Sequence, residues 1–245
     1  MTSERGEQGA MRDKKALVTG GTRGIGFAIA ECLRDRGAVV SVTGTKPNGQ
    51  GPEGCEYLTA DFSAVESSEA FAASIQSTGF DILINNAGIN INSPFAEIES
   101  ADFLKVQQIN VTAPMQLCRA VIPIMRTRGW GRIVNISSIW GIIARETRGP
   151  YAASKFALDG MTAALSAEVA SDGILANCVA PGFIETDLTR RVLGEEGIKK
   201  VTQELPIGRL GQPEEIAALV AWLAGPENTY ITGQNIAIDG GFTRV

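Results

Sequence analysis

The segment Lys15-Ala-Leu-Val-Thr19-Gly20-Gly-Thr-Arg-Gly24-Ile-Gly26 decides the fold of this chain. Its first five residues predict a short buried strand, and residues 27–36 continue as an apolar-periodic helix that ends at Gly37. Glycines at such a turn let the backbone approach a ligand, and the helix N-terminus offers free N–H groups to a phosphate. An ordinary tight turn would use the same glycines. Their position between a strand and a helix favours a nucleotide-binding unit.

The rest of the chain repeats this alternation of strand and helix. Further strands are expected at residues 39–43, 56–60, 81–85, 132–136, 174–179 and 233–238, and further helices at 67–77, 100–126, 151–168 and 213–224. Strands joined by helical crossovers predict an α/β fold, a doubly wound parallel sheet of the Rossmann type with helices on both faces. No shift in composition marks a second domain, so we expect one domain over residues 13–245 and a polar, disordered tail over residues 1–12.

The composition excludes several classes of protein. The 245 residues carry a formal net charge of −5 and no basic run, so no nucleic-acid partner is expected. No apolar run approaches the ~20 residues of a membrane span, and the chain does not start with a signal-peptide pattern. The four cysteines form no Cys-x-x-Cys and are typical of a reducing compartment. We therefore expect a cytoplasmic protein without a membrane partner.

The absence of histidine restricts the chemistry. Ser-His-Asp and Cys-His catalysis cannot occur within the chain, and histidine-based zinc or iron sites are excluded, so we expect no metal. Acid–base chemistry must then use Tyr, Lys, Asp or Glu side chains. Tyr151 and Lys155, four residues apart on a predicted helix, share one face. A lysine there would lower the pKa of the tyrosine toward the pH of a cell, although such a pair taken alone is usually a solvated face.

Polar or glycine-rich clusters follow the carboxyl ends of the predicted strands, where ligands bind in sheets of this kind. These clusters lie at residues 20–26, 61, 85–88, 137–138 and 181–186, and the helix of Tyr151 begins soon after one of them. Packing alone does not explain such a convergence. It predicts a ligand site along this edge of the sheet.

Several motifs resemble, in the same order, those of the classical short-chain dehydrogenase/reductases, from about Lys14 to the end of the chain. Thr19-Gly20-x-x-x-Gly24-x-Gly26 is similar to the family's cofactor turn, Asn85-Asn86-Ala87-Gly88 to its sheet-stabilising motif, and Pro181-Gly182-Phe-Ile184-Glu-Thr186 to its nicotinamide loop. Asn110, Ser138, Tyr151 and Lys155 fall on the four catalytic positions. Within the family, Ala180-Pro-Gly-Phe-Ile-Glu-Thr-Asp187 and Ile231-Thr-Gly-Gln are most similar to bacterial 3-oxoacyl-[acyl carrier protein] reductases.

The resemblance implies a role for each of the four catalytic residues. Tyr151 would protonate the substrate carbonyl, Lys155 would lower the pKa of Tyr151 and bind the nicotinamide ribose, and Ser138 would donate a hydrogen bond to the substrate oxygen. Asn110 would fix a water that links Lys155 to solvent. Taken alone, Ser138 could equally be an ordinary strand-end serine, and Asn110 a helix asparagine that satisfies backbone groups.

The resemblance also implies a nicotinamide cofactor. The residues that would bind it are Gly20, Thr22, Arg23, Gly24, Ile25, Gly26, Thr45, Lys46, Asp61, Phe62, Asn86, Ala87, Gly88, Tyr151, Lys155, Pro181, Gly182, Ile184 and Thr186. An enzyme that prefers NAD usually has a carboxylate at the end of the second strand, but this strand ends Val42-Thr43-Gly44-Thr45-Lys46. Arg23, Thr45 and Lys46 could instead hold a 2′-phosphate. We therefore expect NADP(H), with reduction as the physiological direction.

The loop between Ser138 and Tyr151 should form a wall of the substrate pocket. Within it, Trp140 and Ile142 offer apolar contacts, while Arg145 and Arg148 could meet an anionic or highly polar group unless they are solvated. Ser138 would face the same pocket.

The acyl carrier protein is acidic, and Asp172 stands where similar reductases carry an arginine, although Arg126 and Arg128 could compensate. We therefore favour a small-molecule ketone of a specialised pathway as the substrate. The alternative is a 3-oxoacyl-[acyl carrier protein] reductase of fatty-acid or polyketide synthesis. A non-catalytic nucleotide-binding sensor or scaffold is a hypothesis of another class, and related epimerases or dehydratases resemble a longer form of chain.

The helices at about 100–126 and 151–169 carry apolar residues on more of their circumference than one sheet can cover. Phe156, Leu158, Met161 and Leu165 are examples on the second helix. An apolar face without a sheet to cover it indicates a partner. Because these helices form a dimer interface in the resembling family, we expect a homotetramer, or failing that a dimer.

Overall fold

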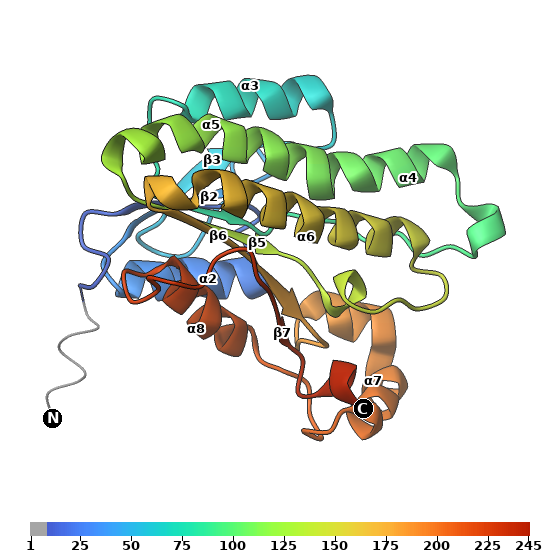
Figure 1. Cartoon of the computed structure of the whole chain (residues 1–245). Coiled ribbons are helices and arrows are strands. Elements are labelled where there is room, and N and C mark those ends of the chain that lie inside the picture. Colours follow the sequence, from blue (N-terminus) through green and yellow to red (C-terminus); the bar gives the residue numbers. More distant parts are fainter. Residues whose placement is uncertain (1–8) are drawn as a thin grey trace, which may run out of the picture.

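The computed structural model describes residues 9–245, apart from the side chain of Leu188, and contains one seven-stranded sheet (Figure 1). All its strand pairs are parallel, in the order β3-β2-β1-β4-β5-β6-β7. The strands are β1 (Lys15–Val18), β2 (Val39–Gly44), β3 (Glu56–Thr59), β4 (Ile82–Asn85), β5 (Gly131–Ile136), β6 (Ile174–Pro181) and β7 (Asn235–Ile238). The predicted doubly wound α/β fold is confirmed.

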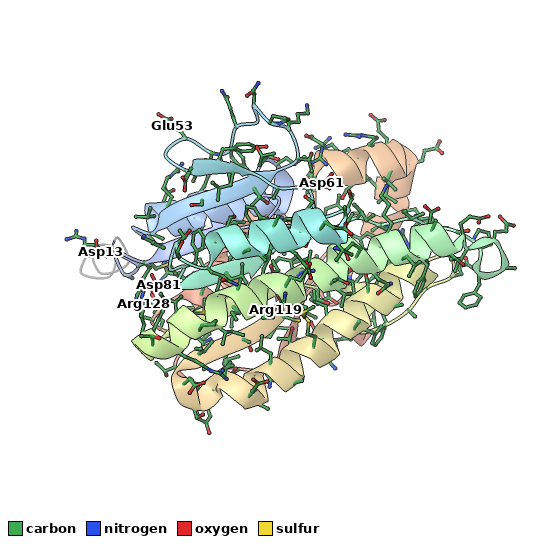
Figure 2. All side chains as sticks on the ribbon, turned by 90° about the horizontal axis from the view of Figure 1, so that it is seen from above. Asp13, Glu53, Asp61, Asp81, Arg119 and Arg128 are labelled. Carbon is green, nitrogen blue, oxygen red and sulfur yellow. The ribbon has the colours of Figure 1, made fainter. Side chains whose placement is uncertain are left out.

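Helices cover both faces of the sheet, as Figure 1 shows. They are α2 (Gly24–Asp35), α3 (Val65–Ile75), α4 (Ser100–Gln107), α5 (Ala113–Arg128), α6 (Gly149–Val169), α7 (Asp187–Glu204) and α8 (Pro213–Ala224). Helices α2 and α8 pack on one face through residues such as Leu33 and Val220, and α3, α5 and α6 lie side by side over the other (Figure 2). Because both faces are covered, β4, β5 and β6 are buried along their whole length rather than alternating between buried and exposed residues.

The direction of the crossovers creates the binding edge. From β1 the chain runs outward to β2 and β3, then returns to β4 on the other side of β1. The loops after β1 and β4 therefore part at this point and leave a crevice outside the carboxyl ends of the strands. Both the glycine turn and the motif at residues 85–88 lie there.

Asp81 and Arg128 mark the opposite edge of the sheet, at the amino end of β4 (Figure 2). Arg128 Nη1 lies 2.7 Å from Asp81 Oδ1 and donates to the Gly79 carbonyl at the same distance. Arg126 lies near by at the end of α5, where its Nε is 2.7 Å from Asp172 Oδ2, just before β6. Both ion pairs are therefore remote from the loops that follow the strands.

Two elements differ from the sequence-based expectation. The long helix at residues 100–126 is interrupted by a π-helical turn, Gln108–Thr112, which separates α4 from α5 and contains Asn110. Turns of this kind often occur at functional sites. Helix α7 was not predicted, because it is mostly polar and has a kink at Gly194, where φ is 62°.

The expected boundary of a disordered tail at residue 12 is wrong for residues 9–12; residues 1–8 lie outside the described part of the chain. Met11 is fully buried in the core beneath α2, and its backbone N–H donates to the Arg36 carbonyl at 3.1 Å. The packed domain thus includes Met11. Among residues 9–245, no helix is both long and apolar enough to cross a membrane.

Candidate active site

The glycine turn has the backbone geometry of a phosphate cradle. Gly20 and Gly24 have φ values of +64° and +55°, which L side chains rarely adopt. A side chain at Gly26 would collide with the Asn86 amide and the Gly20 carbonyl. The turn therefore requires glycine at these positions, and α2 begins directly beneath it with free N–H groups.

Thr19 and Asn86 hold this turn against the end of β4. Thr19 Oγ1 accepts hydrogen bonds from the N–H groups of Asn86 and Ala87, both at 2.9 Å. In return, the Asn86 side chain donates to the carbonyls of Thr19 and Gly20, at 2.9 and 3.1 Å. The motif at residues 85–88 thus fixes the shape of the cradle. Thr19 is a positioning residue, which the sequence motif includes without indicating this role.

A buried chain of side chains continues from this motif into the sheet and α6. Asn85 Nδ2 donates to Asn135 Oδ1, and Asn135 Nδ2 donates to Thr162 Oγ1, each at 2.8 Å. Buried amides that satisfy one another in this way rigidify a core. The chain fixes α6 relative to β4 and β5, and so fixes Tyr151 and Lys155 on α6. No motif marks Asn135 or Thr162, because such a network depends on tertiary contacts.

Lys155 is almost fully buried, with 4% of its surface exposed, and its ammonium donates to the Ile136 carbonyl at 2.7 Å. Its Nζ lies 5.4 Å from the centre of the Tyr151 ring. Burial lowers the pKa of Lys155 to about 8, because a charge away from water is costly. The predicted proximity of the two side chains on one helical face is present.

Burial raises the pKa of Tyr151, while a hydrogen bond with Ser138 and the positive charge of Arg148 act in the opposite direction. The expectation that Lys155 lowers this pKa is therefore corrected for the protein alone, where removal from water is the larger effect. A tyrosine with a raised pKa keeps its proton at neutral pH. Tyr151 therefore carries the proton that an acid would give.

Ser138 follows β5 and is nearly buried, with its hydroxyl directed by the loop that it begins. Its Oγ accepts a hydrogen bond from the Trp140 N–H at 3.2 Å and is left with its own proton to donate. Ser138 is also near enough to Tyr151 to lower its pKa, so two hydroxyl groups lie close together. Such a pair can stabilise negative charge that develops on a carbonyl oxygen.

Asn110 is fully occupied by protein partners. Its Nδ2 donates to the Ile89 carbonyl at 2.9 Å and to Ser154 Oγ at 3.0 Å, and its Oδ1 accepts from the Ile89 N–H at 2.9 Å. A side chain at Gly88 would lie within 4 Å of both Asn110 and Lys155. Asn110 therefore joins the π-helical turn to α6 beside Lys155, and its role in holding a water stays a prediction.

The chain also matches known proteins over nearly its whole length. Residues 20–243 match a family model described as enoyl-(acyl carrier protein) reductase. The chain is 40% identical over 240 residues to 3-oxoacyl-[acyl-carrier-protein] reductase FabG of Vibrio cholerae, with 94% of this chain and 98% of that protein covered. It is 38% identical over 252 residues to a tropinone reductase homolog of Arabidopsis thaliana, with coverage of 96% and 94%. A structure of gluconate 5-dehydrogenase from Burkholderia cenocepacia in complex with NADP and tartrate superposes with a TM-score of 0.88 at 29% identity, covering 98% of each chain.

The chain belongs to the short-chain dehydrogenase/reductase family. It is accordingly an oxidoreductase of the class that interconverts ketones and secondary alcohols.

Other residues predicted to bind the cofactor differ in how exposed their side chains are. Arg23, Thr45 and Lys46 are exposed, and no carboxylate of residues 9–245 pairs with either cation. Asp61 is exposed, and its carboxylate accepts the Ser63 N–H at 2.9 Å, which lowers its pKa. Phe62 is buried against Phe71 in the core, so only its backbone can face a cofactor.

The loop after β6 reaches back over the glycine turn. Thr186 caps α7, and a Cβ at Gly24 would lie 3.5 Å from its side chain. An open pocket of about 430 Å³ adjoins this contact. It is lined by Gly24, Glu185, Thr186, Asp187, Arg190 and Gln212. Ile184 is buried beneath the loop, and Gly182 passes so close to Asp239 that a side chain would not fit. The cradle and this loop thus border the same open pocket.

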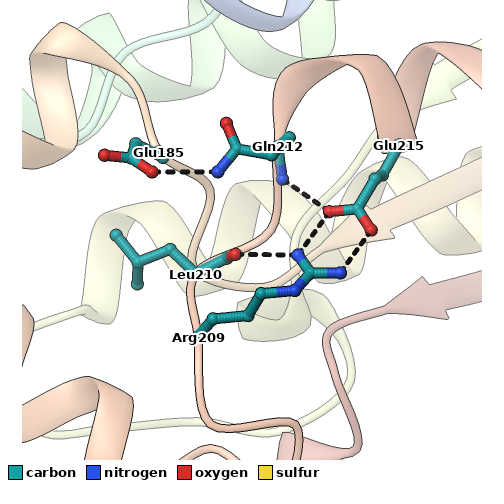
Figure 3. A network of polar contacts seen from close by, with 5 residues as sticks. All are labelled: Glu185, Arg209, Leu210, Gln212 and Glu215. Atoms are coloured by element: carbon teal, nitrogen blue, oxygen red, sulfur yellow. Dashed lines mark hydrogen bonds and ion pairs between the residues drawn. The ribbon is translucent and has the colours of Figure 1, made fainter.

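A polar network fastens this loop to the start of α8 (Figure 3). Gln212 Nε2 donates to Glu185 at 2.9 Å, and the Gln212 N–H donates to Glu215 at 2.7 Å. Arg209 forms two bonds of 2.7 Å with the same Glu215 carboxylate, which lowers the pKa of Glu215 to about 2. The loop over the cradle is therefore tied to α8, which packs beside α2 on the same face of the sheet.

On the substrate side, Trp140 joins an aromatic wall that sequence reasoning found only in part. The Trp140 ring meets Phe183 edge-on at 6.2 Å and Phe242 at 6.3 Å, and the two phenylalanines meet at 5.3 Å. Tyr151 and Ile143 pack against this cluster. Phe183 stands within the nicotinamide-loop motif, but Phe242 comes from the C-terminal segment, and no motif marks it.

The other predicted pocket residues divide into two groups. Ile142 and Arg145 are exposed and outside the aromatic wall, with Ile142 38% exposed. Arg148 is half-buried, and its guanidinium lies 6.0 Å from the centre of the Trp140 ring. Of the two arginines, only Arg148 therefore borders the site of Tyr151.

Proposed function

We propose that this enzyme reduces the ketone of a free small molecule to a secondary alcohol, with NADPH as hydride donor and Tyr151 as general acid. The observation that carries this proposal is the convergence of Tyr151, Ser138 and Lys155 beside the glycine cradle. Tyr151 is protonated at neutral pH, the form in which it can donate to a carbonyl oxygen, and reduction is the direction that uses this proton.

The chain's own residues fit a dinucleotide. The cradle at residues 20–26 and the start of α2 would hold the pyrophosphate, and the loop at 181–186 would cover the nicotinamide. Arg23, Thr45 and Lys46 would hold a 2′-phosphate, and NADP in the related gluconate dehydrogenase structure supports the same choice. When bound, the cofactor supplies the hydride.

The residues around the carbonyl would act together. Tyr151 gives its phenolic proton to the carbonyl oxygen, while Ser138 donates a hydrogen bond to the same oxygen. The Lys155 ammonium, held by the Ile136 carbonyl, lies near enough to stabilise the phenolate that remains. The aromatic wall of Trp140, Phe183 and Phe242 excludes water from this point.

A free ketone is preferred over a carrier-bound acyl chain because the two arginines that could attract an acidic carrier protein are already paired. Arg126 contacts Asp172 and Glu168, and Arg128 contacts Asp81. Ser93 and Thr147, joined by a backbone hydrogen bond of 3.0 Å, bring the acidic segment around Glu97 beside the start of α6. Such charges repel an acidic partner. Reduction of a 3-oxoacyl-[acyl carrier protein] stays the second candidate, since the FabG relative is 40% identical.

Steady-state kinetics test this proposal. With NADPH, the enzyme should reduce small ketones with a higher kcat/KM than acetoacetyl-[acyl carrier protein], and Tyr151→Phe should be inactive with both. A clear preference for the carrier-bound substrate would reverse the choice of substrate. Absence of turnover with every ketone would favour a non-catalytic sensor, and a product that retains the oxidation state would indicate an epimerase or dehydratase.

We further propose that the enzyme is a homotetramer. Helices α4, α5 and α6 leave Leu104, Met115 and Phe156 exposed, at 65%, 39% and 46%. On another side of the molecule, Trp222 on α8 is 39% exposed and Tyr230 before β7 is 95% exposed. Leu158 is buried in the fold, so it does not contribute to such a surface as expected. Two separate apolar surfaces support two interfaces. A monomer in light scattering at micromolar concentration would contradict this.

A further inference from the structure

Arg148 is a partly buried cation without a negative partner. It precedes α6, three residues before Tyr151. Its Nη1 donates to the neutral Asn92 Oδ1 at 2.7 Å, and none of its other N–H groups has a partner in the described part of the chain. Burial lowers its pKa, and the neighbouring charge of Arg145 acts in the same direction. The arrangement leaves most of a guanidinium available beside the general acid.

The other arginines of residues 9–245 that are not exposed differ from Arg148, because each is paired with a carboxylate or donates to several backbone carbonyls. Arg34 pairs with Asp35, and Arg36 pairs with Glu227. Arg132 donates to the carbonyls of Gly131, Gly173 and Asn228. A partly desolvated cation with one neutral acceptor is unfavourable unless a ligand completes it. Arg148 is therefore placed for binding rather than for stability.

Its surroundings also fix its direction. Asn92 holds one end of the guanidinium, and its loop is attached to the loop of Arg148 through the hydrogen bond from the Ser93 N–H to the Thr147 carbonyl. The Trp140 ring lies on another side at 6.0 Å. Tyr151 and Arg148 are close enough for each to alter the pKa of the other. A group bound by Arg148 would thus lie next to the carbonyl that Tyr151 protonates.

We propose that Arg148 binds a carboxylate of the substrate, so that the preferred substrate is a keto acid with an apolar body against the aromatic wall. This rests on the proposed ketone reduction. A carboxylate suits a single planar guanidinium, which can donate two parallel hydrogen bonds to it. Glu97 and Glu99 follow the loop of Asn92, and Glu146 precedes Arg148 by two residues, so acidic groups in these segments disfavour ligands of higher negative charge. The aromatic wall supplies apolar contact for the rest of the molecule.

The test compares acids with their neutral esters. Benzoylformate and 4-oxo-4-phenylbutanoate, which differ in the distance from ketone to carboxylate, are each paired with the methyl ester and assayed with NADPH. Wild type should prefer at least one acid over its ester by roughly tenfold or more, as expected for a charge-assisted hydrogen bond. Arg148→Gln should lower kcat/KM for that acid by about 10- to 100-fold, mainly through KM, and change the ester by less than about threefold.

Three controls distinguish binding from other roles. Arg148→Lys should recover part of the preference for the acid, because it restores the charge without the planar fork. Arg119→Gln removes the same charge from an exposed position on α5 and should leave kcat/KM unchanged for both acid and ester. NADPH affinity, measured by fluorescence, should be equal in all variants and shows that each is folded.

Several outcomes overturn the proposal. The proposal is contradicted if wild type reduces neither acid better than its own methyl ester. Equal losses for acid and ester in Arg148→Gln, with a shifted pH profile, would mean that Arg148 acts only through the pKa of Tyr151. Reduction of neutral ketones without reduction of acids would overturn this inference but leave the proposed ketone reduction intact. No reduction of any ketone would overturn both.

Discussion

The two sides of the active site differ in how their polar groups are satisfied. On the cofactor side, Thr19, Asn86 and Asn110 all have protein partners between 2.9 and 3.1 Å. On the substrate side, Arg148 has one neutral partner and a wall of aromatic rings beside it. Thr19, Asn86 and Asn110 are therefore held by protein partners before any ligand binds, whereas Arg148 leaves donors for a ligand to use. This difference suggests a fixed catalytic apparatus joined to a pocket whose contacts define the substrate.

Tyr151 belongs to both sides, because it lies on the rigid helix and packs against the aromatic wall. Replacing it should give the largest effect. Tyr151→Phe removes the proton donor and little else, so we expect kcat to fall by about 10³-fold or more while the Kd for NADPH stays within a few-fold. Stopped-flow and fluorescence titration check the two halves of this expectation.

Tyr230→Phe removes the same hydroxyl from a side chain that is 95% exposed and serves as the matched control. Its kcat should equal that of wild type. Activity of Tyr151→Phe within a few-fold of wild type would contradict the assignment of Tyr151 as acid.

The buried charge of Lys155, on the cofactor side, lowers the stability of the folded protein at neutral pH. The pKa of Lys155 is about 8 in the folded protein and near 10.5 when the chain is unfolded, so between these values the unfolded state binds more protons. Stability therefore rises with pH in this window, and below pH 8 the cost of the buried charge is fully present. At 1.36 kcal/mol per unit, the gain from pH 8 to 10.5 is on the order of 3 kcal/mol.

Lys155→Met removes this titration. The free energy of unfolding of the cofactor-free wild type, relative to that of Lys155→Met, should rise between pH 8 and pH 10.5 in denaturant titrations. A difference that stays constant with pH would show that the lysine is not buried as a charge.

The sequence located the cofactor side better than the substrate side, for a physical reason. Glycines that need positive φ, such as Gly20 and Gly24, and a tyrosine–lysine pair on one helical face are local patterns that neighbouring residues reveal. The aromatic wall is assembled from the loop after β5, the loop after β6 and the C-terminal segment. Contacts between such distant segments leave no periodic signal, and Phe242 was therefore missed.

The same reason explains the other differences. Met11 was assigned to a polar tail because its contacts form only when the chain folds, and one buried apolar side chain among charged neighbours is not a pattern. The pKa of Tyr151 was expected to fall because the charge of Lys155 can be read from spacing, whereas the larger effect of burial depends on the whole fold. Sequence spacing identifies partners, but it does not measure their distance from water.

A glycine substitution tests whether the hydrogen bonds that hold the cradle are fixed before the cofactor binds. In Gly26→Ala, the new methyl group meets the Asn86 amide and the Gly20 carbonyl, which are hydrogen-bonded to each other and hold the cradle in place. Overpacking of this kind costs about 1–3 kcal/mol, so we expect the Kd for NADPH to rise by roughly 10- to 100-fold with a lowered Tm. Isothermal titration calorimetry and thermal unfolding measure the two effects.

Gly160→Ala, also within a helix, is the control, because a Cβ there meets nothing within 4 Å. It should leave NADPH affinity unchanged and raise stability slightly, since alanine is the better helix former. Equal behaviour of the two variants would mean that Asn86 can move and that the cradle is not fixed in advance.

Arg23 provides the smallest effect and the sharpest contrast with Arg148. Both are cations without a carboxylate partner among residues 9–245, but Arg23 is exposed at the start of α2, whereas Arg148 is half-buried. Exposed charges are screened by water and salt, so a bond from Arg23 to a 2′-phosphate is worth less than a buried one. We expect Arg23→Ala to lower kcat/KM for NADPH by about 10-fold and to leave kcat/KM for NADH within about twofold of wild type.

The loss of kcat/KM for NADPH in Arg23→Ala should shrink as salt is raised from 0.05 to 0.5 M, whereas the loss of acid preference in Arg148→Gln should persist. A wild-type enzyme that prefers NADH, or an Arg23→Ala loss shared equally by both cofactors, would contradict a 2′-phosphate site at this position.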